Sequence, residues 1–282
     1  MTGDADPPRG LLAVFAHPDD ESFGAGGTLA LAASAGIPTR LVCATNGDLG
    51  GGDGAREMDP EVRRRELRCA ASAMGIGEPI FLGYRDSGME GWPKPAGCLA
   101  LADPGEVVER VAAVIRRLRP AVVLTFDPGG IYGHPDHVAI SARASAAFEL
   151  VTTEPGGPRV LYHQALARSA IGRLRGMFEA LAAQGGLPPR EPTEDDRLQE
   201  RRLAELARPD DEITTIIDVR AVLDRKLAAL ACHASQMSGR NWNDAPRDLL
   251  EAYLGAETFA RVVPAPPRDL RECALSGLEP VL

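Results

Sequence analysis

The chain has 282 residues, with 40 Asp or Glu against 31 Lys or Arg, so its formal net charge is -9. Hydrophobic residues make up 44% and charged residues 25% of it, which is typical of a soluble globular protein and excludes a disordered or collagen-like chain. The acidic balance and the lack of a dense Lys/Arg run argue against nucleic acid or an anionic membrane as a partner. We therefore expect a small-molecule partner.

The N-terminal region lacks the features of a membrane span or a signal peptide. Its longest apolar run, Leu11–Ala16, is far shorter than the roughly 18 residues that suggest a span. Asp4 and Asp6 stand where a signal peptide would be basic, so we expect a cytoplasmic protein. The five cysteines are widely spaced and form no C-x-x-C pair, so we expect reduced thiols and neither disulfides nor a cysteine zinc site.

Short apolar segments alternate with longer helical segments from residue 10 to about 150, which is the pattern of an α/β domain. In chain order, the pattern predicts strands at Leu11–Ala16, Thr39–Thr45, Pro79–Gly83 and Ala121–Phe126 and helices at Gly26–Ala35, Pro60–Met74 and Pro104–Leu118. Each strand is apolar throughout, as parallel strands buried on both faces are. Asp59 and Asp103 precede prolines and are placed to cap the last two helices.

The segment after residue 150 is less regular. It predicts strands at Arg159–Gln164 and Ile213–Val219 and helices at Ser169–Ala183, Thr193–Ala207 and Arg220–Cys232. We expect one domain over residues 1–282, with a core of about 10–150 and a smaller C-terminal elaboration of about 151–282. The expected fold class is α/β, with a Rossmann-like, mostly parallel sheet, helices on both faces and the active site at the carboxyl edge.

The residues His17-Pro18-Asp19-Asp20-Glu21 directly follow the first predicted strand. A buried strand gives no structural reason to end on one imidazole and three carboxylates. A metal site does, because imidazole and carboxylate are standard zinc ligands. A divalent cation would also relieve the repulsion between adjacent carboxylates and leave one of them free to act as a base.

A second cluster, Tyr132-Gly133-His134-Pro135-Asp136-His137, follows the fourth predicted strand. Three of the five histidines, His17, His134 and His137, are therefore expected at strand ends on one edge of the sheet. Taken singly, each of them could be a capping, turn or surface residue. Together they predict a metal site, although spacing does not decide which of His134 and His137 binds the metal.

Two other enzyme classes fit part of the sequence. Gly24-Ala25-Gly26-Gly27 suggests a dinucleotide-binding loop, but Leu29 stands where the G-x-G-x-x-G pattern needs Gly or Ala. A metallophosphoesterase usually needs further bridging carboxylates for two metals, and only one three-ligand set is visible. We therefore favour a fold of the Rossmann kind without its cofactor.

The motifs Ala16-His17-Pro18-Asp19-Asp20-Glu21 and Gly133-His134-Pro135-Asp136-His137 resemble those of the LmbE-like (PIG-L) superfamily of zinc-dependent N-deacetylases. The similarity covers most of residues 10–150 and includes Thr45-Asn46-Gly47 and Asp86-Ser87-Gly88-Met89. A weaker similarity lies in Lys226–Gln236, which contains His233. The double motif is highly specific, whereas the shorter phrases alone are not.

The resemblance implies roles for the residues of the first motif. His17, Asp20 and His137 would hold Zn²⁺, or another divalent metal, and leave an open position for water. Asp19 would be the general base. A non-catalytic sugar-binding protein on the same fold is the alternative from another class, but such a protein should have lost a ligand or the base, and all are present.

The second motif would supply the remaining catalytic groups. By the same resemblance, His134 would provide positive charge or a proton near the tetrahedral intermediate, with Asp136 as its orienting partner. Tyr132 would help the metal to stabilise the oxyanion.

The resemblance also implies the substrate class. The expected reaction is hydrolysis of the acetamido group of an N-acetylglucosamine-containing small-molecule glycoside, and the alternative is cleavage of a larger glucosaminyl amide, such as a thiol conjugate. Arg63 and Asp86 match sugar- or phosphate-contacting positions, and Met89 with Trp92 would form an apolar wall. The alternatives are a solvated helix face for Arg63, a turn for Asp86 and buried packing for Met89 and Trp92.

Overall fold

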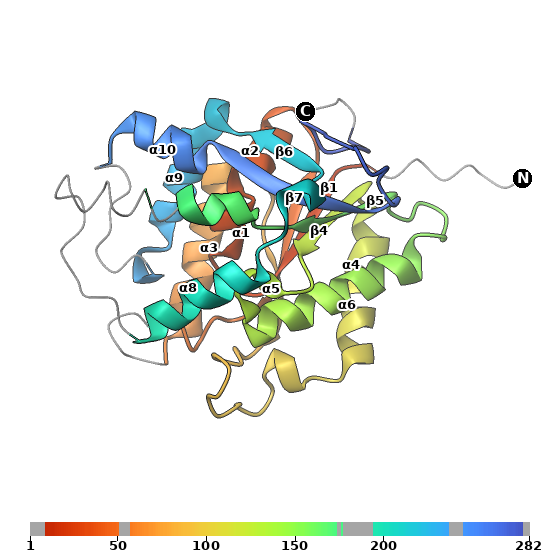
Figure 1. Ribbon diagram of the computed structural model, residues 1–282. Coiled ribbons are helices and arrows are strands. Elements are labelled where there is room, and N and C mark those ends of the chain that lie inside the picture. Colours follow the sequence, from red (N-terminus) through yellow and green to blue (C-terminus); the bar gives the residue numbers. More distant parts are fainter. Residues whose placement is uncertain (1–8, 51–56, 174–175, 177–193, 237–244, 279–282) are drawn as a thin grey trace, which may run out of the picture.

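The computed structural model describes residues 9–50, 57–173, 176, 194–236 and 245–278, and their strands form a seven-stranded sheet of order β3-β2-β1-β4-β5-β7-β6 (Figure 1). The strands are β1 (Leu11–Phe15), β2 (Thr39–Thr45), β3 (Ile80–Tyr84), β4 (Val122–Phe126), β5 (Val160–Gln164), β6 (Thr215–Asp218) and β7 (Ala256–Val263). The five neighbouring strands β3, β2, β1, β4 and β5 run parallel to one another, and β7 is antiparallel to its neighbours β5 and β6. The prediction of a mostly parallel α/β sheet is confirmed.

Helices cover both faces of the sheet. On one face α2 (Gly26–Ser34), α3 (Pro60–Met74) and α9 (Leu223–Cys232) pack together, and on the other α4 (Pro104–Leu118) packs on α6 (Pro135–Val151) (Figure 1). Further helices are α1 (Asp20–Gly24), α5 (Gly130–Gly133), α8 (Glu194–Leu206) and α10 (Arg247–Leu254), with short 3-10 turns η1 (Leu99–Leu101), η2 (Asp210–Glu212), η3 (Arg220–Val222) and η4 (Ala234–Gln236). Residues 168–173 and 176 are also helical and fall in the predicted helix 169–183, most of which lies outside the described residues. None of the described helices is long and apolar enough to span a membrane.

Local sequence explains most of these elements. Every residue of β1 and β4 is buried, which accounts for their uninterrupted apolar character. Asp59 accepts a hydrogen bond from the Glu61 amide and Asp103 one from the Glu106 amide, so both helix starts are capped as predicted. The chain leaves β1 toward β2 on one side and returns to β4 on the other. This reversal opens a crevice at the carboxyl ends of these strands, where open α/β sheets bind ligands.

Strand β7 was not predicted. It carries Glu257, a charged residue that argues against a buried strand, yet Glu257 is only 4% exposed. Its carboxylate accepts hydrogen bonds from Lys226 Nζ at 2.6 Å and from the Gly27 and Thr28 amides at 2.8 Å. The burial of this charge depends on partners about 30 and 230 residues away, which no local pattern reveals.

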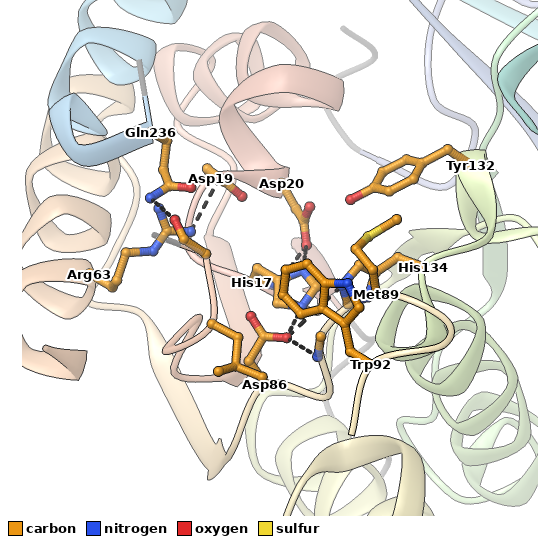
Figure 2. Close-up of a pocket in the computed structure, with 13 residues that line it drawn as sticks. His17, Asp19, Asp20, Arg63, Asp86, Met89, Trp92, Tyr132, His134 and Gln236 are labelled. Carbon is orange, nitrogen blue, oxygen red and sulfur yellow. Dashed lines mark hydrogen bonds and ion pairs between the residues drawn. The ribbon is translucent and has the colours of Figure 1, made fainter. Parts of the chain in front are cut away.

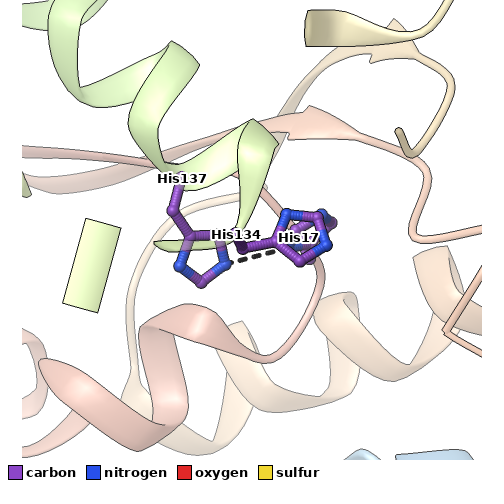
Figure 3. A group of neighbouring side chains, drawn as sticks. All are labelled: His17, His134 and His137. Atoms are coloured by element: carbon purple, nitrogen blue, oxygen red, sulfur yellow. Dashed lines mark hydrogen bonds between the residues drawn. The ribbon is translucent and has the colours of Figure 1, made fainter. Parts of the chain in front are cut away.

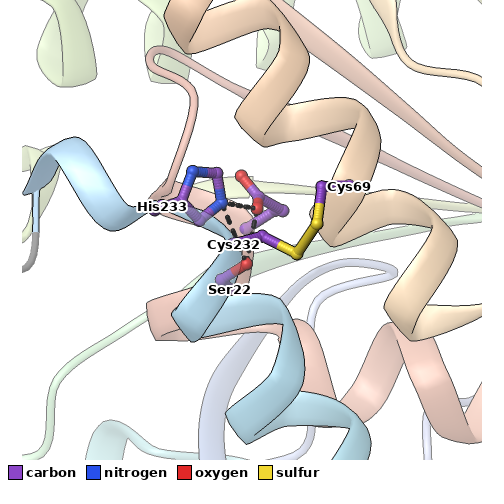
Figure 4. Close-up of a disulfide and its surroundings, with 5 residues drawn as sticks. Ser22, Cys69, Cys232 and His233 are labelled. Carbon is purple, nitrogen blue, oxygen red and sulfur yellow. Dashed lines mark hydrogen bonds and ion pairs between the residues drawn. A yellow bond between two sulfur atoms is a disulfide. The ribbon is translucent and has the colours of Figure 1, made fainter. Parts of the chain in front are cut away.

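The expectation that all cysteines are reduced thiols is wrong for two of them. Cys69 on α3 and Cys232 at the end of α9 form a disulfide across 163 residues of sequence (Figure 4). The two helices pack side by side and bring the Cα atoms within 5.7 Å, a proximity that spacing in the sequence does not show. Cys43, Cys98 and Cys273 are free thiols.

Candidate functional site

A cavity of about 310 Å³ lies at the carboxyl edge of the sheet (Figure 2). Its lining comes from the segments after β1, β2, β3 and β4, from α3 and from η4: His17, Asp19, Asp20, Leu49, Gly50, Arg63, Asp86, Gly88, Met89, Trp92, Tyr132, His134 and Gln236. Of the eleven site residues that the sequence predicts, nine line this cavity. The other two, Asp136 and His137, are buried beside His17.

Two imidazoles and one carboxylate converge at the base of the cavity. His17 Nδ1 lies 3.1 Å from His137 Nε2, and a nitrogen of His134 lies within 4.8 Å of both histidines (Figure 3). Asp20 Oδ1 lies 3.2 Å from His137 Nε2, and Asp20 Oδ2 lies 3.5 Å from His17 Nδ1. A tetrahedral ion with bonds of about 2.1 Å keeps its ligand atoms about 3.4 Å apart. The two imidazoles, and each imidazole with one oxygen of Asp20, therefore lie at the spacing of ligand atoms around a small metal ion.

The far side of each imidazole is fixed by an acceptor. His137 Nδ1 lies 3.2 Å from the Gly130 carbonyl oxygen, and His17 Nε2 lies 3.2 Å from a carboxylate oxygen of Asp136. These acceptors favour a proton on the far nitrogens and leave the facing lone pairs for a metal. The close approach of His137 also explains why residue 130 is a glycine, because a Cβ at this position would lie 2.7 Å from the His137 Cβ.

The electrostatic field at this point favours a cation. Burial lowers the pKa of His17, but the carboxylates of Asp86, Asp136 and Asp20 outweigh it and raise that pKa well above its ordinary value. A cluster in which the buried imidazole is surrounded by carboxylates is a favourable place for a divalent ion.

Asp19 projects into the cavity from a strained backbone. Its φ of 137° lies in a region that residues other than glycine rarely adopt. Burial raises the pKa of Asp19, and the opposing effect of the Arg63 guanidinium is smaller. Arg63 Nη2 lies 3.2 Å from Asp19 Oδ2 and also donates to the Pro18 carbonyl oxygen. The carboxylate is therefore held in place, and its raised pKa suits a group that accepts protons.

Comparison with known proteins places the chain among enzymes that remove acetyl groups. Residues 12–148 match the family described as PIG-L, GlcNAc-PI de-N-acetylase. The chain is 39% identical over 253 residues to the 1D-myo-inositol 2-acetamido-2-deoxy-alpha-D-glucopyranoside deacetylase of Rhodococcus opacus, with 82% of each chain covered. The chain belongs to the PIG-L family. The predicted family and enzyme class are confirmed.

Two further matches are consistent with this family. The enzyme of the same name from Kineococcus radiotolerans is 37% identical over 264 residues, covering 83% of this chain and 70% of the relative. Among solved structures, N,N'-diacetylchitobiose deacetylase from Pyrococcus horikoshii matches with a TM-score of 0.59 over 93% of this chain and 86% of its own, at 19% identity. That likeness supports the fold.

Within this PIG-L chain, Asp136 contacts His134 differently from our expectation. The Asp136 backbone amide donates to His134 Nδ1 at 3.1 Å, whereas its carboxylate faces His17 and accepts hydrogen bonds from the Ser87 amide and hydroxyl. The pKa of His134 is lowered to about 2, first by burial and then by the imidazoles of His17 and His137. Because Nδ1 accepts this hydrogen bond, the neutral imidazole of His134 carries its proton on Nε2.

Tyr132 lies across the cavity from Asp19. Figure 2 shows its hydroxyl directed toward the His17 and Asp20 side of the cavity. Burial and the nearby carboxylate of Asp20 raise its pKa, so the hydroxyl keeps its proton and remains a hydrogen-bond donor. The ring packs edge-on against His137, with centroids 5.0 Å apart.

The segment after β3 forms the wall of the cavity opposite α3. Asp86 and Met89 in this segment line the cavity. The Lys94 ammonium holds the segment in shape by donating to the carbonyl oxygens of Ser87, Gly88 and Met89 at 3.0, 3.2 and 3.0 Å. Burial raises the pKa of Asp86, but the imidazole of His17 and the Gly88 amide outweigh it and hold that pKa well below its usual range.

Arg63 is not on a solvated helix face. Its side chain is 1% exposed and lines the cavity. Leu49 and Gly50, to which the sequence assigns no role, also line it. They belong to the glycine-rich segment after β2, in which no motif is recognisable. Gln236, in the weaker region of similarity, reaches this segment by donating to the Gly50 carbonyl oxygen at 2.7 Å.

Proposed function

We propose that this chain hydrolyses the acetamido group of an N-acetylglucosaminyl inositol, releasing acetate and a free amine, with one Zn²⁺ held by His17, Asp20 and His137. The observation that carries the proposal is the triangle formed by the His17, Asp20 and His137 side chains beside Asp19. Their nearest nitrogen and oxygen atoms lie 3.1 to 3.5 Å apart, with one oxygen of Asp20 facing each histidine. The substrate is the one named for the relatives in Rhodococcus opacus and Kineococcus radiotolerans.

The donor set suits zinc. Two imidazole nitrogens and one carboxylate oxygen make a three-ligand catalytic site that leaves one coordination position open. A zinc ion bound there would polarise the acetamido carbonyl and lower the pKa of a water molecule.

Asp19 takes the proton from the attacking water. Its carboxylate lies in the cavity beside the proposed ligands, does not belong to the triangle, and is oriented by Arg63. A general base must be ionised in the resting enzyme and able to accept a proton during attack, and a buried carboxylate beside an arginine meets both demands.

His134 and Tyr132 act on the acetamido group. Both are hydrogen-bond donors in the cavity, His134 through Nε2 and Tyr132 through its hydroxyl. Donors fixed in place before the reaction stabilise the negative charge that develops on the carbonyl oxygen. Asp19, protonated once water has attacked, passes that proton to the leaving amine, so the proton taken from water leaves with the product.

The rest of the cavity fits a small polar glycoside. Arg63 and Gln236 lie on one side, Asp86 supplies a carboxylate for sugar hydroxyls, and Met89 and Trp92 supply an apolar surface. A volume of about 310 Å³ lies at the lower end of the range for small-molecule sites.

Acetate release tests the proposal. The protein is stripped with a chelator, reloaded with Zn²⁺, and assayed on 1D-myo-inositol 2-acetamido-2-deoxy-α-D-glucopyranoside, on free N-acetylglucosamine and on a glucosaminyl inositol carrying a larger N-acyl group. We expect turnover only after reloading and the highest kcat/KM on the first compound. Faster cleavage of the larger amide would contradict the deacetylase assignment, and activity that survives complete stripping would contradict the metal.

A further inference from the structure

Glu21 is a buried carboxylate that lies directly behind Asp19 and outside the cavity. It is 0% exposed, and its Oε2 accepts a hydrogen bond from the Asp19 backbone amide at 3.1 Å. Its Oε1 accepts from the Ser22 hydroxyl at 2.5 Å and lies 2.8 Å from His233 Nε2. A carboxylate without exposure to water needs such donors, so these contacts define where Glu21 sits.

His233 reaches Glu21 from the far end of the chain. The two residues are 212 positions apart, and His233 is 0% exposed at the end of α9, directly after Cys232 of the disulfide (Figure 4). The Cys69–Cys232 disulfide ties this end of α9 to α3, the helix that carries Arg63. His233 does not line the cavity, so it has no direct route to a substrate.

The backbone of Asp19 needs such support. With φ 137° and ψ -27°, it adopts a conformation that a residue with a side chain avoids unless the surrounding structure enforces it. Arg63 holds the carboxylate of Asp19, and Glu21 holds its amide. Without the bond to Glu21, the segment can relax to an ordinary φ, and the carboxylate then turns away from the position set by Arg63.

We propose that Glu21 and His233 form a positioning pair for Asp19. His233 donates to Glu21, Glu21 accepts the Asp19 amide, and the strained backbone aims the Asp19 carboxylate at the reacting centre. Neither member touches the substrate, so both act only through Asp19. The inference rests on the proposed function for its effect on turnover, whereas its effect on the Asp19 backbone does not depend on any activity.

The first experiment compares His233→Phe, which removes the donor, with His233→Gln, which restores an N–H near the position of Nε2. We expect kcat of His233→Phe to fall about 10²-fold, the scale on which a catalytic group is misplaced by about 1 Å. KM should stay within about twofold and the metal content per chain should be unchanged, because the lost group binds neither substrate nor ion. His233→Gln should recover most of kcat. His163→Gln, at another buried histidine that does not line the cavity, is the control and should keep kcat within about twofold.

The second experiment follows the Asp19 amide by hydrogen exchange in the wild type, His233→Phe and Glu21→Gln. We expect this amide to exchange at least about tenfold faster in both variants. Glu21→Gln keeps the shape of the side chain. Its single carbonyl oxygen cannot accept from both the Asp19 amide and His233, which contact different oxygens of Glu21. The His17 amide, which donates to Asp20 Oδ2 at 2.7 Å, is the internal reference and should not change.

Two results would overturn the proposal that Glu21 and His233 position Asp19. One is a folded, metal-loaded His233→Phe enzyme whose kcat stays within about twofold of wild type or falls only in proportion to lost metal. The other is an Asp19 amide that is equally protected in all three proteins. If the wild type releases no acetate, the proposed function fails, and the exchange measurement still decides whether Glu21 and His233 position Asp19.

Discussion

Arg63 and Asp19 form a hydrogen-bonded ion pair inside the cavity, with Nη2 and Oδ2 3.2 Å apart and the guanidinium almost fully buried. The arginine comes from α3 and the aspartate from the turn after β1, so the pair joins two crossover units of the sheet. Gly47 permits this approach, because a Cβ at that position would lie 2.9 Å from Arg63 Nε. The pair fixes the carboxylate to which we assign the role of base.

Replacing Asp19 by Asn should abolish turnover and spare the metal. The amide keeps the shape of the side chain but does not take a proton from water, and Asp19 is outside the triangle of ligand atoms. Acetate release and metal content per chain are the measurements. Near-normal turnover, or loss of the ion, would contradict the assignment of Asp19 as base.

Replacing Arg63 by Met should lower kcat by about 10- to 100-fold, the effect of losing a hydrogen bond to a charged group. Arg63→Lys keeps the charge but reaches only one of the two partners that Arg63 Nη2 contacts, Pro18 O and Asp19 Oδ2. We expect an intermediate rate for it. Equal rates for both variants and the wild type would show that the guanidinium does not orient the base.

The two histidines of the second motif should differ in metal binding. His137→Ala removes a corner of the ligand triangle and should release the ion, whereas His134→Ala should retain it, because we assign the coordinating positions to His17, Asp20 and His137 although His134 lies close to both histidines. Zinc content after dialysis against a weak chelator distinguishes them. The assignment is reversed if His134→Ala loses the ion and His137→Ala keeps it.

Much of the fold could be predicted because its signals are local. The parallel strands are buried on both faces and read as apolar runs, and the caps at Asp59 and Asp103 fix the starts of α3 and α4. The histidines of both motifs follow such strands, so their meeting at one edge could be inferred from the order of elements.

The remaining features depend on contacts between distant segments. Glu257 can enter β7 only because Lys226 neutralises it, and the Cys69–Cys232 pair exists only because α3 packs on α9. The orientation of the Asp136 carboxylate toward His17 depends on the position of Ser87 after a different strand. None of these partners is near in sequence, so periodicity and spacing carry no record of them.

The disulfide should stabilise the fold. A bond that closes 163 residues removes about 5 kcal/mol of chain entropy from the unfolded state in the simplest model, and measured values are about 2 to 5 kcal/mol. The double variant Cys69→Ser, Cys232→Ser should lose this amount in denaturant unfolding, whereas Cys273→Ser, at an exposed free thiol, should not. Thiol titration of the denatured chain should find three thiols before reduction and five after it. Five thiols before reduction would contradict the bond.

The last prediction concerns a histidine far from the motifs. His163 on β5 is 6% exposed, and its Nε2 lies 3.1 Å from the Ser145 hydroxyl. Burial, with a smaller effect of Arg208, lowers its pKa to about 4. The folded protein therefore keeps this imidazole neutral while the unfolded chain protonates it near pH 6.5.

Stability should consequently be present in full above pH 6.5 and be lost as the pH falls toward 4, because the unfolded state then binds more protons. Between pH 7 and pH 5 the loss due to His163 is about 2 kcal/mol. His163→Gln keeps a polar group near Ser145 but does not titrate, so its free energy of unfolding should fall by about 2 kcal/mol less over the same interval. All other titrating groups are shared by the two proteins and cancel in this comparison. Parallel pH profiles for the wild type and His163→Gln would show that His163 is protonated in the folded protein as readily as in the unfolded chain.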